Sequence, residues 1–170
     1  QVELYSPKPE DLWFREKMLS DSETMSYNAG YKPIYEGYHY ESGCIDFTKE
    51  KWETWHKEKM SKMLYYYIKD LETSEFVGEV SCRVNEKIGN IGVIIFSSYR
   101  GKGYMKPAIL QLFEKAKEKG LAILIDECVP LSREVAVGCF KDLGFKQIKR
   151  YKTYKFDKEE EMIDLQIDLS

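Results

Sequence analysis

An apolar run, a glycine-framed basic segment and a helix-like segment follow one another over residues 91–116. The run IGVIIF (91–96) leads into SSYRGKGYM (97–105), and apolar residues then recur at helical spacing. The first turn of a helix has N–H groups without partners, and the helix dipole adds positive charge, so such a junction binds anions. Gly101 and Gly103 allow close approach of the backbone, and Arg100 and Lys102 add formal charge. The stretch predicts a phosphate cradle, with pyrophosphate the preferred ligand.

Two widespread phosphate loops do not fit this segment. A Walker A loop needs Gly-Lys-Ser/Thr, whereas Lys102 is followed by Gly103. The dinucleotide fingerprint needs three spaced glycines after an early strand of a parallel sheet, and here only Gly101 and Gly103 are present.

The segment resembles the coenzyme A loop of the GNAT superfamily of N-acetyltransferases, whose motif is Arg/Gln-x-x-Gly-x-Gly/Ala. Arg100 and Gly103 match the motif, and Met105 stands where Gly or Ala is usual. The later segment REVAVGCFKDLGF (133–145) resembles the family helix that ends in Leu-Gly-Phe. The resemblance extends to the element order along nearly the whole chain.

The resemblance implies acetyl-CoA as co-substrate. The strand before the loop would hydrogen-bond the pantetheine arm as a neighbouring strand does, through Val93, Ile94 and Ile95. Main-chain N–H groups of the loop would surround the pyrophosphate. The loop residues are Arg100, Gly101, Lys102, Gly103, Tyr104 and Met105. Met105 keeps its N–H but adds bulk where the helix meets the cofactor.

Acetyl transfer to an amine needs a base, because a free primary amine with a pKa near 10.4 is mostly protonated at neutral pH. Many relatives carry an acid on the strand before the loop, and IGVIIF has none. We therefore expect the base at the end of the next strand, in Glu127 or Asp126, with Glu79 in reserve. Strand alternation sends only one of the adjacent pair into the cleft, and Glu127 is preferred slightly. Solvated strand-end charges remain the alternative.

The proton donor for the leaving thiolate is not evident from the sequence. Relatives often place a Tyr four residues before the helix-ending Gly, and here that residue is Phe140. Tyr99, Tyr104, a tyrosine of the early loop or solvent are the candidates. Cys139, next to it, is expected to face the core.

Residues 24–43 are rich in Tyr and Gly and show no sustained period, which predicts an irregular segment. Its tyrosines either line an acceptor pocket or pack an Ω-like loop. Glu36 and Glu41 could attract a cationic amine, and His39 is a weaker functional candidate. The tyrosines of this segment are Tyr27, Tyr31, Tyr35, Tyr38 and Tyr40.

Strands are expected over 2–6, 64–70, 75–84, 91–96, 121–125 and near 163–169, and helices from about residue 9, after Thr48, over 105–119 and from a Ser132 cap to Leu143. In the last strand Ile163, Leu165, Ile167 and Leu169 alternate with Asp164, Gln166 and Asp168, so one face is expected to be exposed to solvent. The order βα(α)βββαβαββ indicates an α/β (α+β) fold. We expect one domain over 1–170 with a central mixed, mostly antiparallel sheet of six to seven strands and about four flanking helices.

Composition limits the setting. The net charge is −3, the chain has no apolar run of the roughly 18 residues that a membrane span needs, and QVELYSPKPED has no export-signal pattern. Neither nucleic acid nor a membrane is an expected partner. The four cysteines lack metal-ligand spacing and sit in apolar contexts, so we expect no metal and a cytoplasmic location.

The chain is therefore expected to be an acetyl-CoA-dependent N-acetyltransferase for the primary amine of a small molecule, by direct attack in a ternary complex. A protein or peptide acceptor, and a non-catalytic acyl-CoA-binding module, are the alternatives. Homodimers are common in the family that the chain resembles, and no sequence feature establishes one here.

Overall fold

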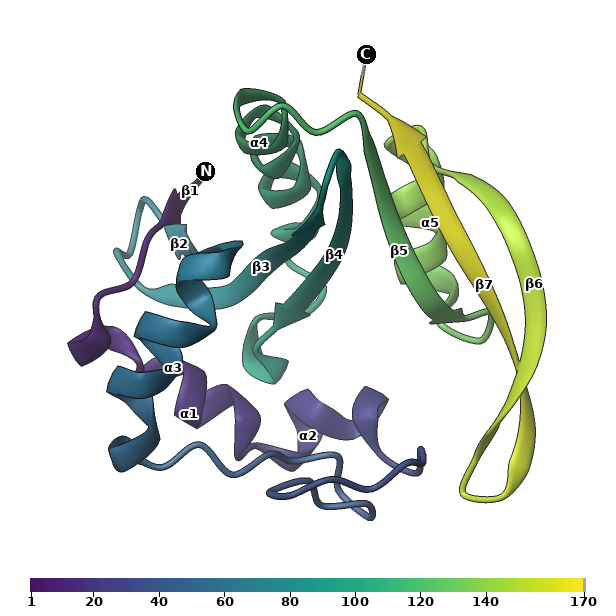
Figure 1. Cartoon of the computed structure of the whole chain (residues 1–170), viewed down its shortest axis with the longest axis horizontal. Coiled ribbons are helices and arrows are strands. Elements are labelled where there is room, and N and C mark those ends of the chain that lie inside the picture. The colour runs from purple at the N-terminus through teal and green to yellow at the C-terminus, as the bar shows by residue number, and fades with distance from the viewer. Residues whose placement is uncertain (170) are drawn as a thin grey trace.

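The computed structural model describes residues 1–169 and contains one seven-stranded sheet (Figure 1). The spatial order is β1-β2-β3-β4-β5-β7-β6, and only β4 and β5 run parallel. The strands are β1 (Val2–Tyr5), β2 (Met63–Asp70), β3 (Phe76–Asn85), β4 (Ile88–Ile95), β5 (Ile123–Pro130), β6 (Lys146–Lys155) and β7 (Lys158–Asp168). The mixed, mostly antiparallel sheet expected from the sequence is confirmed.

Helices cover both faces of the sheet. Buried side chains of α4 and α5 pack in one core cluster with β2–β5 and β7, and α1 packs in a second cluster with Tyr65 and Tyr67 of β2. Leu64, Tyr66 and Ile68 alternate with these tyrosines and belong to the first cluster, as the two-residue period of a strand requires. The α-helices are α1 (Trp13–Leu19), α2 (Ser22–Met25), α3 (Trp52–Glu58), α4 (Met105–Glu118) and α5 (Glu134–Asp142).

Several local expectations were wrong. The strands expected over 75–84 and 91–96 are separated by less chain than their bounds imply, since β3 ends at Asn85 and β4 begins at Ile88, two residues after the positive-φ residue Glu86. Neither Thr48 nor Ser132 caps a helix with its side chain. The Thr48 hydroxyl bonds the Glu50 carboxylate instead, and Arg133 occupies the position before α5.

The helix α4 agrees closely with its sequence pattern. Ala108, Ile109, Leu112, Phe113 and Ala116 are all buried, at the spacing that put them on one face. The chain leaves α4 through Gly120, whose φ of +86° is left-handed and suits glycine. A continuous apolar face therefore anchors the helix whose N-terminus borders the expected phosphate loop.

The strands β4 and β5 separate after a short stretch of pairing. Only Ile88–Asn90 pair with Ile123–Ile125, and beyond them the two strands diverge (Figure 1). The Phe96 N–H donates to the Val77 carbonyl of the β3 side, at 2.9 Å. By the two-residue period, the backbone N–H groups of Val93 and Ile95 point the other way, into the gap. The sheet thus presents an unpaired strand edge in its interior.

This edge corrects one sequence expectation. An unbroken apolar run such as IGVIIF predicts a strand that is buried on both faces, and yet Val93, Ile94 and Ile95 are only half-buried. Their exposure follows from the divergence, because no strand covers that side of β4.

A β-bulge turns β5 away from β4. Between Asp126 and Val129 the pairing with β7 is shifted, and Cys128 adopts a φ of +59°. The carboxylate of Asp164 holds the bulge: its Oδ1 accepts from the Cys128 N–H at 3.1 Å and from the Tyr151 hydroxyl at 2.7 Å. Asp164 was expected on the wet face of its strand, but it is buried with these partners.

Three of the four cysteines also differ from the expectation of core thiols. Cys128 is exposed and Cys44 and Cys139 are half-buried, whereas Cys82 lies in the core, where burial raises the pKa of its thiol to about 11. None of the helices in the described chain is long and apolar enough to cross a membrane.

The close pairing of β4 with β5 depends on Gly89. A Cβ at this residue would meet the Cys82 sulfur and would lie 2.9 Å from methyl carbons of Leu121 and Leu124. We expect Gly89→Ala to lower the free energy of unfolding by about 1–3 kcal/mol, because the packed neighbours must move. Urea unfolding measures the change.

Gly138→Ala is the control for this prediction. Gly138 lies in the middle of α5, and nothing lies within 4 Å of a Cβ there. The same substitution should raise the free energy of unfolding by about 0.5–1 kcal/mol through helix propensity. Equal stability of the two variants would contradict the packing argument.

Candidate active site

One cavity lies beside the glycine-framed loop and the unpaired edge of β4; we call it the loop cavity. It has a volume of about 680 Å³. All but one of the residues expected to bind the cofactor line it: Val93, Ile94, Ile95, Arg100, Gly101, Gly103, Tyr104 and Met105. Lys102 does not line the cavity, and its ammonium lies 6.0 Å from the centre of the Tyr99 ring.

The glycines of the loop leave its backbone open. Gly101 and Gly103 have φ of +74° and +80°, and no atom lies within 4 Å of a Cβ built at either residue. Both features suit a backbone that a ligand approaches closely. The helix α4 begins at Met105, so its first amides border the same space.

Contacts with α2 hold the loop in place. The Thr24 hydroxyl accepts from the Ser97 N–H at 2.9 Å, and the Arg100 guanidinium donates to the Thr24 carbonyl at 2.9 Å. The Asp21 carboxylate accepts from the Ser97 hydroxyl at 2.8 Å, and its hydrogen bonds, chiefly from Thr24, lower its pKa. The position of the loop is therefore set by residues some 75 positions earlier in the chain.

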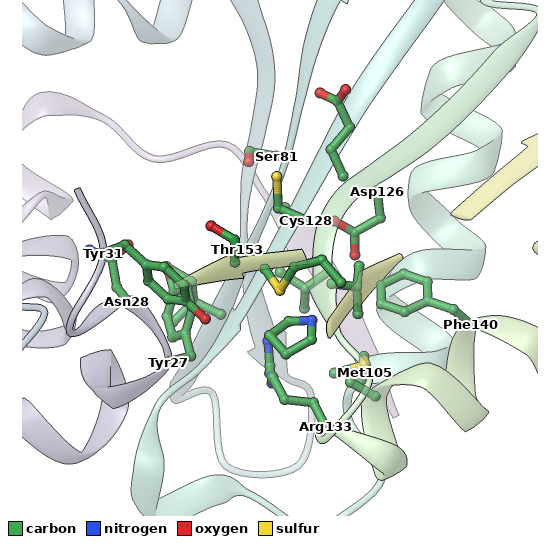
Figure 2. A pocket seen from close by; sticks show the side chains of 18 of the residues that line it. Tyr27, Asn28, Tyr31, Ser81, Met105, Asp126, Cys128, Arg133, Phe140 and Thr153 are labelled. Carbon is green, nitrogen blue, oxygen red and sulfur yellow. The ribbon is translucent and has the colours of Figure 1, made fainter. Parts of the chain in front are cut away.

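A second cavity, of about 600 Å³, lies where β4 and β5 diverge. Its lining includes three acids, Glu79, Asp126 and Glu127, and we call it the carboxylate cavity. In Figure 2, Tyr27 and Tyr31 lie on one side of this cavity and Asp126 and Phe140 on the other.

Asp126 and Glu127 both line the carboxylate cavity, although strand alternation predicts that only one of them would. The bulge at Cys128 breaks the alternation at this point and brings both side chains to the same space. Burial is the main cause that raises the pKa of Asp126, to about 7, and the nearby acids Asp164 and Glu127 raise it further, while Arg133 opposes them. Glu127 is exposed and accepts a hydrogen bond from the Asn90 amide at 3.1 Å.

Glu79 is already engaged by the protein. Its Oε1 accepts from the Arg15 guanidinium at 3.0 Å and from the Tyr65 hydroxyl. The Arg15 guanidinium also lies 4.1 Å from the Trp55 ring centre, between α1 and α3. A buried carboxylate with an ion-pair partner serves to anchor α1 on the sheet.

The two cavities meet in the middle of the gap. Six residues line both of them: Tyr27, Val93, Ile94, Met105, Arg133 and Ala136. Five elements contribute these residues, namely the turn after α2, strand β4, the start of α4, the residue before α5, and α5 itself. A long ligand in the loop cavity would bring its end to this junction, next to the carboxylate cavity.

Among the tyrosines that line the two cavities, only Tyr27 has a hydroxyl without a protein partner in residues 1–169. Tyr31 donates to Glu160, Tyr99 to Glu75, Tyr104 to Asp70 and Tyr151 to Asp164. Burial is the main cause that raises the pKa of Tyr27, to about 12, and the Arg133 guanidinium lies 5.5 Å from its ring centre. Tyr27 therefore carries an available proton at the junction.

The tyrosines of residues 24–43 divide between the two roles that the sequence left open, which are lining a cavity and packing within the loop. Tyr27 and Tyr31 line the carboxylate cavity, whereas Tyr38 is buried and stacks on Tyr35 at 4.9 Å. Glu36 and Glu41 are exposed and line neither cavity. His39 is exposed as well and pairs with Asp46 at 2.8 Å.

The helix α5, which carries the second of the two family-like motifs, differs from expectation at one residue. Cys139 lines the loop cavity instead of facing the core, and burial raises the pKa of its thiol. Phe140 is buried in the wall of the carboxylate cavity and packs edge-to-face on Phe145 at 5.0 Å. In the part of the chain that the structure describes, no three His, Cys, Asp or Glu side chains gather as a metal site would need.

Sequence reasoning missed Asp164, Tyr151 and Cys128. Asp164 interrupts an apolar strand, and Tyr151 lies in a strand rich in lysine, so both patterns indicate surface positions. Their partnership arises across the β5–β7 and β7–β6 pairings and leaves no mark in any one segment.

Comparison with protein families identifies the class to which this arrangement belongs. Residues 1–144 match the family described as acetyltransferase (GNAT) domain. The chain therefore belongs to the GNAT acetyltransferase family, as its two motifs predicted, and proteins of this family use acetyl-CoA. No curated protein sequence matches the chain.

Solved structures with the same fold include N-acetyltransferases. An N-acetyltransferase from Staphylococcus aureus Mu50 superposes with a TM-score of 0.76 at 18% identity, over 100% of this chain and 99% of that one. A spermidine N-acetyltransferase from Vibrio cholerae in complex with CoA and spermine superposes with a TM-score of 0.78 at 16% identity, over 99% and 96% of the chains. At these identities the likeness establishes the fold alone.

Proposed function

We propose that this protein is an N-acetyltransferase that moves the acetyl group of acetyl-CoA to the primary amine of a small molecule, in a ternary complex without a covalent enzyme intermediate. The observation that carries the proposal is the pair of cavities joined at the unpaired edge of β4. One cavity lies beside a phosphate-type loop and the other contains carboxylates. Two substrates in these cavities would meet at the junction.

The loop cavity fits coenzyme A. The inward-facing carbonyl of Val93 and the N–H and carbonyl of Ile95 can pair with the amides of a pantetheine arm, as a neighbouring strand would. Gly101, Gly103, Tyr104 and Met105 line the loop cavity, where a pyrophosphate would receive hydrogen bonds from the backbone N–H groups at the start of α4. The bound co-substrate supplies the thioester whose acetyl carbon the amine attacks.

Asp126 is the base in this proposal. Its pKa of about 7 lets it accept a proton from an ammonium group and still be ionised in part at neutral pH. Glu127, which the sequence favoured slightly, is more exposed and is hydrogen-bonded to Asn90. The N–H of Val93 faces the gap at the junction and can stabilise the negative charge that develops on the carbonyl oxygen.

Tyr27 takes the role of proton donor that Phe140 cannot fill. Its hydroxyl lies at the junction, keeps its proton at neutral pH and has no competing protein acceptor in the described chain. The leaving thiolate would receive that proton as the amide forms.

The β6–β7 hairpin favours a small acceptor over a peptide. The Phe156 N–H donates to the Gly30 carbonyl at 2.8 Å, the Lys155 ammonium donates to the Ser26 carbonyl at 3.1 Å, and Tyr31 bonds Glu160. These contacts join the hairpin to the segment after α2, beside Tyr31 and Thr153 of the cavity lining, and leave less room for a peptide than for a small amine.

Binding of coenzyme A tests the proposal directly. In isothermal titration calorimetry we expect binding at millimolar concentration or below, and at least a 10-fold loss in Gly103→Trp, because the indole would fill the space beside the loop. Gly120→Trp is the matched control, since Gly120 also has a left-handed φ and open space but lies at the far end of α4. No binding to the unmodified protein would refute the proposed function.

The pKa of Asp126 predicts the pH dependence. As a base, Asp126 works when ionised, so kcat/KM should rise with pH through about 7. Asp126→Asn should lower kcat by about 100-fold or more and remove this limb, whereas Glu127→Gln should keep it. A profile that Glu127→Gln flattens and Asp126→Asn leaves intact would assign the base to Glu127.

The variant Asp126→Asn should be more stable than the unmodified protein at pH 8. The folded state holds the proton of Asp126 up to about pH 7, and the unfolded state loses it near pH 4, so stability falls as the pH rises between these values. Asp126→Asn removes this cost and should raise the free energy of unfolding at pH 8 by about 1–2 kcal/mol.

Removal of the Tyr27 hydroxyl tests the proton donor. Tyr27→Phe keeps the ring under Arg133 and should lower kcat by about 10- to 100-fold with little change in the KM for acetyl-CoA. Phe140→Tyr in the same protein should restore part of the rate, because it supplies a hydroxyl in the cavity wall. An unchanged kcat in Tyr27→Phe would exclude the residue from proton transfer.

A further inference from the structure

The carboxylate cavity contains as many cationic as acidic side chains, and their pairing bears on which amine it accepts. This inference rests on the proposed function, since it concerns the acceptor of that reaction. The charged residues that line the cavity are Lys32, Glu79, Arg83, Asp126, Glu127 and Arg133.

The acids of the cavity offer little charge to a second cation. Glu79 is neutralised by Arg15, which pairs with it at 3.0 Å and is not itself part of the lining. Asp126 holds a proton in part of the molecules at neutral pH and receives the reacting amine. Glu127 remains as an exposed carboxylate, next to Asn90.

The cations of the cavity are less compensated. Lys32 pairs with Asp157 at 3.4 Å in solvent. Neither Arg83 nor Arg133 has an acidic partner within 4 Å in residues 1–169. Arg133 lines both cavities and lies over Tyr27 at the junction. Arg83 lines the carboxylate cavity and not the loop cavity.

Arg83 lies at the end of the cavity away from the loop. It follows Glu79 and Ser81 on the same face of β3 and pairs in register with Asn90 of β4, the last residue of β4 that still pairs with β5. A guanidinium at this point would face the far end of a substrate whose amine reaches Asp126. A guanidinium fork binds carboxylate and phosphate groups through two parallel hydrogen bonds.

We propose that the acceptor is a small amine that also carries an anionic group, a carboxylate or a phosphate, and that Arg83 binds this group while the amine lies at Asp126. A polyamine with no anionic group would place its second ammonium near Arg83 and would be repelled. The structural relative crystallised with CoA and spermine shares the fold at 16% identity, and that likeness does not fix the acceptor of this chain.

Matched pairs of acceptors test the proposal. With saturating acetyl-CoA, thiol release is measured for γ-aminobutyrate against butylamine, β-alanine against propylamine, phosphoethanolamine against ethanolamine, and for spermidine. We expect kcat/KM to be at least 10-fold higher for the anionic member than for its uncharged counterpart, in either the carboxylate pairs or the phosphate pair. The pair with the larger ratio identifies the anion that the cavity prefers. Calorimetry with CoA-loaded protein should show the same preference in binding.

Variants of Arg83 assign the preference to this residue. Arg83→Gln should raise the KM for the preferred anionic acceptor by about 10- to 100-fold and leave its uncharged counterpart within 2-fold. Arg83→Lys should recover part of the preference, because the charge remains and the fork is lost. Arg150→Gln is the matched control: Arg150 is exposed on β6, pairs with Glu161 and lines neither cavity.

The outcomes separate the two proposals. Turnover of uncharged amines or spermidine at rates equal to or above those of the anionic acceptors would overturn the acceptor assignment and leave the transferase intact. An equal loss for both members of a pair in Arg83→Gln would also overturn it. If the protein bound no CoA and turned over no acceptor, the proposed function would fail together with this inference.

Discussion

The divergence of β4 from β5 is the constraint on which the site depends. A parallel pair of strands normally continues its hydrogen bonds to the end of both strands, and here the pairing ends at Asn90 and Ile125. Backbone N–H and C=O groups in the interior of a protein need partners. The gap exposes a row of them along β4 and leaves them free to bind a chain-like ligand. The strand edge, usually a hazard for aggregation, becomes a binding surface because the rest of the sheet encloses it.

Polar side chains keep the gap open from both sides. On the β5 side the Asp164 carboxylate holds the bulge at Cys128, which bends the strand away. On the β4 side Asp21 and Thr24 bind the segment from Ser97 to Arg100 and fix the loop that follows. Both arrangements use a short side chain to satisfy backbone groups that no strand or helix reaches. The gap is thus built into the fold before any ligand binds.

The electrostatics of the two cavities differ in a way that suits two substrates. The loop cavity presents backbone N–H groups, a helix N-terminus and arginine to a polyanion. The carboxylate cavity holds a half-buried acid with a raised pKa, Asp126, together with an arginine that has no ion-pair partner in the described chain. A base and an anion-binding group at separate points of one cavity define an orientation for the acceptor, and an apolar cavity could not.

The sequence by itself determined the order of the elements, the phosphate-type loop and the helix α4, because each of these depends on local period, glycine placement and helix-end chemistry. It also determined the family, through two motifs 33 residues apart at Arg100 and Arg133. Only the tertiary structure decided which acid has a raised pKa and which hydroxyl is available. The bulge at Cys128 interrupts strand alternation around Asp126. Tyr27 reaches the junction from a segment that lies about 100 residues before Asp126 in the chain. Such properties depend on desolvation and on partners from distant strands, and no window of the sequence contains both.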